Sequence, residues 1–160
     1  LTVGLLLTSD MLHFITTVIS LLASTHSVAI DELRCMTEAI YFEARGEGYI
    51  GQVAVGNVIF NRVNSSSFPD TVCEVVHQGR KYRGQMVKHK CQFSYYCDGK
   101  LERIRNKDSF LTAVKAATAA MTESVISIQA ATHYHTVDVN PYWGKRLEYL
   151  GRIGKHEFYR

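Results

Sequence analysis

The sequence feature that most constrains the fold is the segment from residue 40 to residue 63, IYFEARGEGYIGQVAVGNVIFNRV. Its second half, about 49–63, is apolar on nearly every side, which is typical of a helix buried inside a domain. Ahead of it, a helix is predicted over about 31–45, with Asp31 as its N-cap. Apolar residues recur there at helical spacing: Leu33, Met36, Ile40 and Ala44. The segment therefore predicts two consecutive helices.

Two carboxylates, Glu43 and Glu47, lie within this apolar segment on either side of Arg45. Helical periodicity places Glu43 on the last turn of the first helix, at the edge of its apolar face. Gly46 and Gly48 are expected to end that helix. Glu43 is therefore predicted to face inward beside a glycine-rich bend.

A carboxyl group near apolar side chains loses hydration, so its pKa rises and it stays protonated near neutral pH. Cleavage of a glycosidic bond needs such an acid, because the leaving oxygen must be protonated. In the structural alternative, Glu43 forms a buried ion pair with Arg45 or Arg62, or caps nearby backbone. The pattern by itself favours this alternative, since structural ion pairs also perturb glutamates.

Beyond residue 63 the pattern predicts a loop at 64–70, a short helix within 71–79 and a helix over 108–124 capped by Asp108. The apolar face of the last helix is predicted from four residues: Phe110, Val114, Ala117 and Met121. The period then changes to that of a strand over 131–139, and residues 152–160 are a candidate partner strand. The sequence thus predicts one α+β domain, a helical body with a small β-sheet.

Composition sets limits on the class of protein. The chain has 160 residues, of which 46% are hydrophobic and 21% charged, so a folded core is expected. The formal net charge of +3 is far from that of a dedicated nucleic-acid binder, and no nucleic-acid partner is predicted. A monomer is expected. The basic segment 79–90 is interpreted as a solvated loop, with a surface for an anionic polymer as the alternative.

The N-terminal segment differs from the rest of the chain. Residues 11–29 carry no charged side chain, the apolar run 14–23 has the length of a signal-peptide core, and Ser27-Val28-Ala29 resembles a cleavage site. Residues 1–29 are therefore predicted to be a signal peptide or N-terminal membrane-targeting segment with transient membrane contact, and 30–160 the catalytic domain. The protein is predicted to be exported to the periplasm or cell envelope. A buried or membrane-anchoring helix is the alternative.

Four cysteines are present, an even number that suits disulfides in an exported chain. The spacing from Cys91 to Cys97 is longer than that of a usual zinc knuckle, so disulfides are favoured over zinc. Four cysteines allow three pairings. Cys91 with Cys97 would close a short loop and leave Cys35 with Cys73, and we take this pairing as the working hypothesis.

His133 and His135 are two apart on a predicted strand and would share a face, with Tyr134 pointing the other way. They could bind a metal, with His156 as a third candidate, but no HExxH motif accompanies them, so no metal and no cofactor are predicted. Aromatic and polar side chains also alternate in the less regular segments, which suits the apolar faces and hydroxyl edges of sugars. These side chains are Gln92, Phe93, Ser94, Tyr95, Tyr96, Asp98, Tyr134, Asn140, Tyr142 and Trp143.

Five blocks of the sequence together resemble the SleB/CwlJ family of cell-wall hydrolases: IYFEARGEGYIGQVAVGNVIFNRV, SFPDTVCEVVHQG, CQFSYYCDGK, ATHYHTVDVNPYW and RIGKHEFYR. The resemblance covers about residues 35–160. It implies a lysozyme-like α+β domain, similar to lytic transglycosylases, whose substrate is the peptidoglycan glycan strand. The bond cut would lie between N-acetylmuramic acid and N-acetylglucosamine.

The resemblance further implies that the first glutamate of the E-A-R-G-E block, Glu43, is the catalytic acid. Glu43 would protonate the glycosidic oxygen and then take a proton from the C6 hydroxyl of the sugar, closing a 1,6-anhydro ring. Glu47 is expected to be mainly structural, and it is the second carboxylate if the reaction is instead a hydrolysis. The predicted sugar groove comprises Gln92, Phe93, Ser94, Tyr95, His133, Tyr134 and Trp143. The family often has Trp where this chain has Tyr95.

Three alternatives stay open. One is muramidase-type hydrolysis with Glu43 and Glu47. Another is a metal-dependent peptidoglycan amidase or peptidase that uses His133 and His135. The third is a wall-binding protein without catalytic activity. The spore enzymes of the family prefer muramic-δ-lactam, and this preference is not carried over because no peptidoglycan-binding repeat precedes the domain in the 160 residues.

Overall fold

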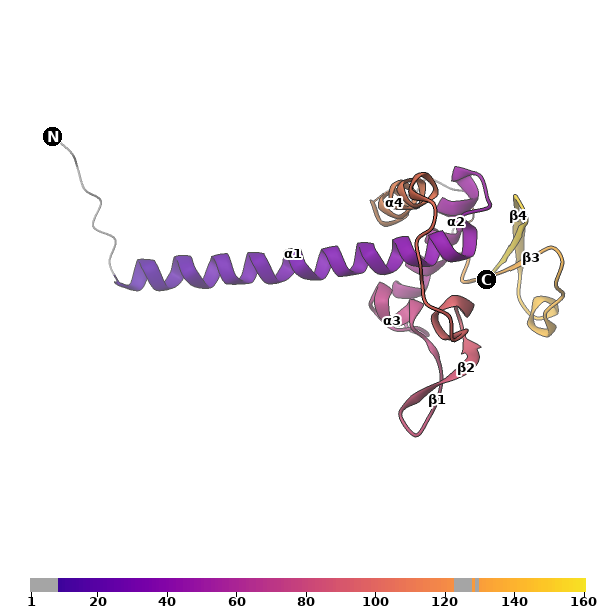
Figure 1. Cartoon of the computed structure of the whole chain (residues 1–160), viewed down its shortest axis with the longest axis horizontal. Coiled ribbons are helices and arrows are strands. Elements are labelled where there is room, and N and C mark those ends of the chain that lie inside the picture. The colour runs from indigo at the N-terminus through magenta and orange to yellow at the C-terminus, as the bar shows by residue number, and fades with distance from the viewer. Residues whose placement is uncertain (1–8, 123–127, 129) are drawn as a thin grey trace. The chain divides into compact units, whose positions relative to one another are not determined.

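The structure, a computed structural model, describes residues 9–122, 128 and 130–160 of the chain. The chain divides into two compact units, Leu1–Asp31 and Glu32–Arg160. Helix α1 (Ser9–Ala44) begins in the first unit and ends in the second (Figure 1). The predicted C-terminal end of this helix is therefore confirmed to within a residue. The predicted N-cap at Asp31 is wrong, because the helix continues through that position.

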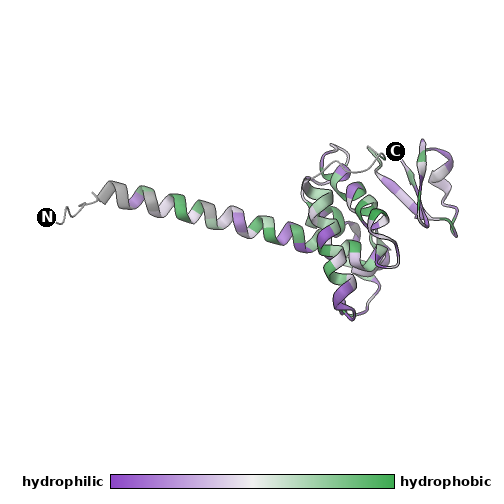
Figure 2. Ribbon diagram, turned by 90° about the horizontal axis from the view of Figure 1, so that it is seen from above, coloured by the Kyte–Doolittle hydropathy of each residue, from purple (hydrophilic) through white to green (hydrophobic). Residues whose placement is uncertain are grey.

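In the first unit, α1 exposes apolar side chains among polar ones, and Figure 2 shows the two kinds interspersed along it. The exposed large apolar side chains are Phe14, Val18, Ile19, Leu21, Val28 and Ile30. Within the described part of the chain, no helix combines the length and the apolar character that crossing a membrane requires.

The helical body of the second unit is built around α2 (Tyr49–Val63), whose apolar residues are buried on most sides as the sequence predicts. Helix α4 (Lys107–Thr122) packs closely against α2. Gly56 of α2 allows this close approach, because a Cβ atom there would lie 2.7 Å from the Cβ of Ala120 and 3.0 Å from Cδ1 of Ile40. The end of α1 completes the core.

Helix α4 corrects two details of the sequence prediction. The helix begins at Lys107, and the side chain of Asn106 caps it by accepting a hydrogen bond from the Ser109 N–H at 2.8 Å, so Asp108 lies in the first turn instead. The buried face consists of Ala113, Ala116, Ala117 and Ala120. Of the predicted face, Ala117 is fully buried, while Phe110 and Met121 pack at the margin of the core. The last two residues predicted for this helix, 123 and 124, lie outside the described residues.

Helix α3 (Val72–Val76) is joined to α1 by the Cys35–Cys73 disulfide. The strands β1 (Gly79–Tyr82) and β2 (Gln85–Cys91) follow as an antiparallel hairpin. The interpretation of segment 79–90 as a loop is therefore wrong, although most of its residues are exposed. The 3-10 helix η1 (Ser94–Cys97) comes next, and a second disulfide joins Cys91 to Cys97. Both pairings taken as the working hypothesis are confirmed.

The C-terminal sheet is antiparallel with the strand order β3-β5-β4. Its strands are β3 (His133–Thr136), β4 (Tyr149–Ile153) and β5 (His156–Tyr159), and the 3-10 helix η2 (Tyr142–Lys145) lies between β3 and β4. The predicted pairing of the segments 131–139 and 152–160 is confirmed, with β4 as an additional strand. Apolar residues of α2, of the segment before β3 and of β5 share a second small core: Ala54, Val58, Ile128, Ala131 and Phe158. The predicted α+β class is therefore confirmed.

Candidate active site

Glu43 lies on the last turn of α1, one residue before the helix ends. The backbone N–H groups of Ser94 and Tyr95 and the Ser94 hydroxyl lie close enough to its carboxylate to act on its pKa. Burial raises the pKa of Glu43 and outweighs these donors, which act to lower it. The protonated form of this carboxyl group is therefore favoured relative to that of an ordinary glutamate.

The structural alternative of a buried ion pair is not realised. The guanidinium group of Arg45 lies 5.2 Å from the centre of the Tyr41 ring. Arg62 is buried and donates a hydrogen bond to the carbonyl oxygen of Thr132 at 2.7 Å. Among the described residues, no ion pair joins Glu43 to either arginine. No neighbouring cation therefore offsets the effect of burial on the Glu43 pKa.

Glu43 opens onto a cavity of about 310 Å³, which we call the Glu43 pocket. It lies between α1 and α2, the segment ahead of η1 and the C-terminal sheet. Its lining includes five of the seven residues predicted for the sugar groove, Gln92, Phe93, His133, Tyr134 and Trp143. It also includes Arg62, His135, Thr136 and His156. The other two predicted groove residues, Ser94 and Tyr95, line a separate pocket.

One wall of the Glu43 pocket is formed by the imidazoles of β3. His133 and His135 share a face, as predicted, and their ring centres lie 5.3 Å and 5.6 Å from that of Trp143. Nε2 of His135 lies 3.0 Å from the hydroxyl of Tyr159, which in turn donates to Glu157 at 3.1 Å. Burial lowers the pKa of His133, so this imidazole is neutral at neutral pH.

These histidines do not gather into a metal site in the structure. Within residues 9–122, 128 and 130–160, no group of three or more His, Cys, Asp and Glu side chains is arranged to hold a metal ion. Nδ1 of His133 lies 3.0 Å from the Thr132 hydroxyl, and Nδ1 of His135 lies 2.9 Å from the Thr136 carbonyl oxygen. Each imidazole thus has a hydrogen-bond partner in a residue next to it in the sequence.

His156 and Arg62 are pocket residues that the sequence analysis did not assign to the sugar groove. His156 is 3% exposed, and burial lowers its pKa. Its Nδ1 atom has no hydrogen-bond partner in the part of the chain that the structure describes. Its ring lies edge-on to Tyr134, with ring centres 5.1 Å apart. A buried, unpaired nitrogen in the wall of a pocket is available to a hydroxyl or amide of a bound ligand.

Glu47 does not line the Glu43 pocket. Its carboxylate accepts the backbone N–H of Lys155, in the turn between β4 and β5, at 3.0 Å. Glu47 therefore joins the α1–α2 bend to the C-terminal sheet through this hydrogen bond. Its backbone carbonyl oxygen also accepts a hydrogen bond from the side chain of Gln52 at 3.1 Å.

Comparison with known proteins places the chain in a family. The family model described as Cell Wall Hydrolase matches residues 46–159. The spore cortex-lytic enzymes of Bacillus cereus and Bacillus subtilis are 33% and 31% identical over 128 residues, which is 80% of this chain. The chain spans 44% and 37% of the lengths of these two relatives.

Two solved structures agree with this assignment. The catalytic domain of the germination-specific lytic transglycosylase SleB from Bacillus anthracis is 34% identical with a TM-score of 0.64, and the match covers 81% of this chain and 93% of that domain. The SleB catalytic domain of Bacillus cereus is also 34% identical, with a TM-score of 0.61. The family model begins after Glu43, so it does not bear on the role of that residue. The chain belongs to the cell wall hydrolase family and has the fold of the SleB catalytic domain.

Proposed function

We propose that this protein cuts the glycan strand of peptidoglycan between N-acetylmuramic acid and N-acetylglucosamine, as a lytic transglycosylase with Glu43 as its single general acid and base. The observation that carries the proposal is the burial of the Glu43 carboxyl, which raises its pKa at the wall of the Glu43 pocket. Membership of the cell wall hydrolase family and the likeness to a lytic transglycosylase support it.

In the proposed reaction the Glu43 carboxyl gives its proton to the glycosidic oxygen as the bond between that oxygen and C1 of the muramic acid breaks. The C6 hydroxyl of the same sugar then bonds to C1, and its proton passes to the Glu43 carboxylate. The products are a 1,6-anhydro end and a free hydroxyl, and the acid is regenerated. The Ser94 and Tyr95 N–H groups would stabilise the carboxylate between the two steps.

The hydrolytic alternative needs a second carboxylate that activates water or attacks the sugar. Glu47 is the candidate, but its carboxylate is bonded to the Lys155 N–H and does not line the pocket. The geometry therefore favours the reaction that needs a single carboxyl group.

Peptidoglycan lies outside the cytoplasmic membrane, so the proposed function includes export of the protein. The segment 1–29 is the proposed signal peptide or N-terminal membrane-targeting segment, and the periplasm or cell envelope the proposed location. The protein is proposed to act as a monomer.

The test is digestion of purified sacculi by wild-type protein and by Glu43→Gln, with mass spectrometry of the released products. The matched control is Glu148→Gln, which makes the same chemical change at an exposed residue paired with Arg160. We expect 1,6-anhydro ends from wild type and control, and none from Glu43→Gln. Normal digestion by Glu43→Gln would refute the role of Glu43. Reducing ends would identify a hydrolase, and released peptides an amidase or peptidase.

A further inference from the structure

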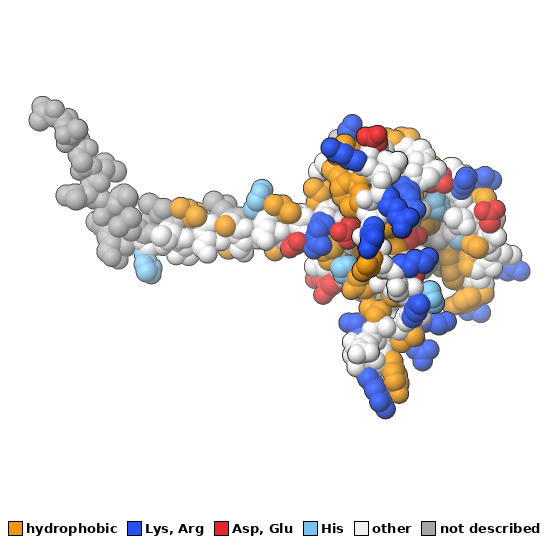
Figure 3. All heavy atoms as spheres, in the orientation of Figure 1, with side chains coloured by type: hydrophobic (Ala, Val, Ile, Leu, Met, Phe, Trp, Pro, Cys, Tyr) orange, Lys and Arg blue, Asp and Glu red, His pale blue; other side chains and the backbone are white. Residues whose placement is uncertain are grey.

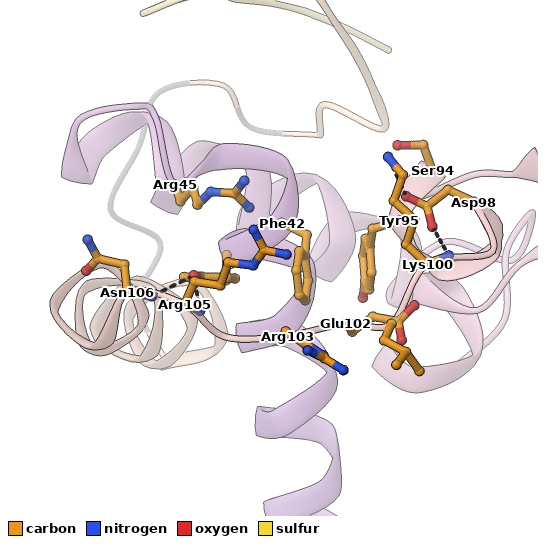
Figure 4. A pocket seen from close by; sticks show the side chains of 12 residues that line it. Phe42, Arg45, Ser94, Tyr95, Asp98, Lys100, Glu102, Arg103, Arg105 and Asn106 are labelled. Atoms are coloured by element: carbon orange, nitrogen blue, oxygen red, sulfur yellow. Dashed lines mark hydrogen bonds and ion pairs between the residues drawn. The ribbon is translucent and has the colours of Figure 1, made fainter.

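A second pocket, of about 510 Å³, lies beside the segment that joins η1 to α4. Three aromatic rings line it: Tyr41 and Tyr95 are buried, and Phe42 stacks on Tyr95 with ring centres 4.8 Å apart. Four basic and two acidic side chains surround these rings: Arg45, Lys100, Arg103, Arg105, Asp98 and Glu102. We call this cavity the arginine pocket (Figure 4).

The arginine pocket and the Glu43 pocket are lined by neighbouring residues of the same segments. Phe42, which directly precedes Glu43, lines the arginine pocket. Ser94 and Tyr95, whose N–H groups act on the pKa of Glu43, line the arginine pocket as well. The residue before them, Phe93, lines the Glu43 pocket. The proposed catalytic carboxyl group therefore lies where the linings of the two pockets meet.

The positive charge of the arginine pocket is only partly neutralised. Lys100 pairs with Asp98 at 3.8 Å. Among the residues that the structure describes, no carboxylate lies within 4.0 Å of the guanidinium groups of Arg45, Arg103 and Arg105. Figure 4 shows Arg45 and Arg105 on one side of Phe42 and the Lys100–Asp98 pair beyond Tyr95. Figure 3 shows several Lys and Arg side chains on the face where the η1–α4 segment runs.

Tyr95, which lines the arginine pocket, carries a buried hydroxyl group. This hydroxyl has no hydrogen-bond partner within the described ranges. Buried polar groups are nearly always paired with protein, water or ligand. Arginine recognises carboxylates with paired hydrogen bonds, and aromatic rings accommodate small apolar side chains. The lining thus fits a short peptide that carries free carboxylates.

We propose that the arginine pocket binds the stem peptide of the muramic acid next to the scissile bond, through the free carboxylates of that peptide. The inference rests on the proposed function. In peptidoglycan the stem peptide is attached to the lactyl group of muramic acid, so a sugar bound at Glu43 carries its peptide close to the bond that is cut. The substrate is then a peptide-bearing glycan, and bare glycan is cleaved less well.

The test compares two substrates made from one batch of sacculi, stripped of phosphodiester-linked polymers. One substrate keeps its stem peptides, and an amidase has removed them from the other. The readout is the rate at which 1,6-anhydro ends form at limiting substrate. The rate on the peptide-bearing substrate is divided by the rate on the substrate without peptides. The wild-type 160-residue chain is compared with Arg45→Gln/Arg105→Gln. The matched control, Arg80→Gln/Arg83→Gln, removes the same charge from the β1–β2 hairpin.

We expect wild type and control to share a ratio that favours the peptide-bearing substrate. In Arg45→Gln/Arg105→Gln this ratio should fall about fivefold, which corresponds to the loss of two exposed ion pairs. The wild-type ratio should also fall as salt is added. An unchanged ratio in the double variant would overturn the inference, and so would an equal fall in the control. If no anhydro ends form from either substrate, the proposed function itself is wrong.

Discussion

The Glu47 carboxylate accepts the backbone N–H of Lys155 at 3.0 Å, across 108 positions of the sequence. This hydrogen bond joins the bend between α1 and α2 to the turn between β4 and β5. Strand β5 begins with His156 and pairs with β3, and residues of both strands line the Glu43 pocket. Glu47 thus fixes the sheet that forms one wall of the pocket.

We predict that Glu47→Ala lowers the free energy of unfolding by about 1 kcal/mol, because an exposed hydrogen bond that joins two distant segments is lost and water takes its place at the Lys155 N–H. Activity on sacculi at a temperature where the variant is folded should fall less than about tenfold. Urea unfolding and a rate assay measure the two effects. A loss of activity as large as that of Glu43→Gln, with an intact fold, would instead indicate the two-carboxylate hydrolysis.

Gly154 lies in the same turn with a φ of +58°, and a Cβ atom there would collide with the Glu47 carboxylate. Gly154→Ala should therefore both strain the backbone and displace Glu47 from the Lys155 N–H. We predict a loss of about 1–3 kcal/mol in the free energy of unfolding. Gly46→Ala is the matched control, because a Cβ atom at Gly46 has no neighbour within 4 Å and its φ is not in the left-handed region. Equal losses in the two variants would contradict the proposed role of the turn.

The two disulfides are expected to contribute differently to stability and to activity. Cys35–Cys73 closes 38 positions of sequence, and its removal as Cys35→Ser/Cys73→Ser should cost about 4 kcal/mol of unfolding free energy. Cys91–Cys97 closes 6 positions, and its removal should cost about 2 kcal/mol. Ser94 and Tyr95 lie inside the shorter loop, so this second loss should also reduce the turnover number. Thermal unfolding and rate assays on the folded variants distinguish the two effects.

Sequence periodicity was sufficient to place the proposed acid. Helical spacing put Glu43 at the edge of an apolar face, and the glycines after it put the helix end within one residue of its position in the structure. The same reasoning identified α2 as buried and β3 as a strand with His133 and His135 on one face. These features follow from local patterns, which a single segment carries by itself.

The features that the sequence did not reveal depend on contacts between distant segments. Arg62 lines the Glu43 pocket and donates a hydrogen bond to the carbonyl oxygen of Thr132, 70 positions away in the sequence. The β1–β2 hairpin lacks an alternating apolar face, since most of its residues are exposed, so no strand period marks it. Residues 92 and 93 line the Glu43 pocket, whereas residues 94 and 95 line the arginine pocket. This division depends on where Glu43 meets η1, and the spacing of residues within 92–95 does not predict it.

The raised pKa of Glu43 also predicts how stability depends on pH. A carboxyl whose pKa is higher in the folded than in the unfolded protein favours folding below the unfolded value, about 4.3, and that stability is lost as pH rises through the folded value. Glutamine does not ionise, so Glu43→Gln should have the higher melting temperature at pH 7. The difference should shrink below about pH 4. Glu148→Gln serves as the control, and equal behaviour of the two variants would refute the raised pKa of Glu43.

The last prediction concerns Ser94, whose hydroxyl and backbone N–H both act to lower the Glu43 pKa against the effect of burial. In Ser94→Ala the hydroxyl is lost and the backbone N–H is kept, so the Glu43 pKa should rise further above that of an ordinary carboxyl group. Because the general acid works in its protonated form, activity declines as pH rises through this pKa. The basic limb of the profile of kcat/KM against pH should therefore move to higher pH in Ser94→Ala.

Ser65→Ala provides the matched control, since the Ser65 hydroxyl accepts only a local backbone hydrogen bond, at 3.4 Å, in the loop after α2. Its pH profile should overlay that of wild type. A shift of the Ser94→Ala limb to lower pH would contradict the arrangement, because it would mean that the hydroxyl stabilises the protonated acid. An unmoved limb would mean that a group other than Glu43 sets the basic side of the profile, and Glu43 would then no longer be the proton donor.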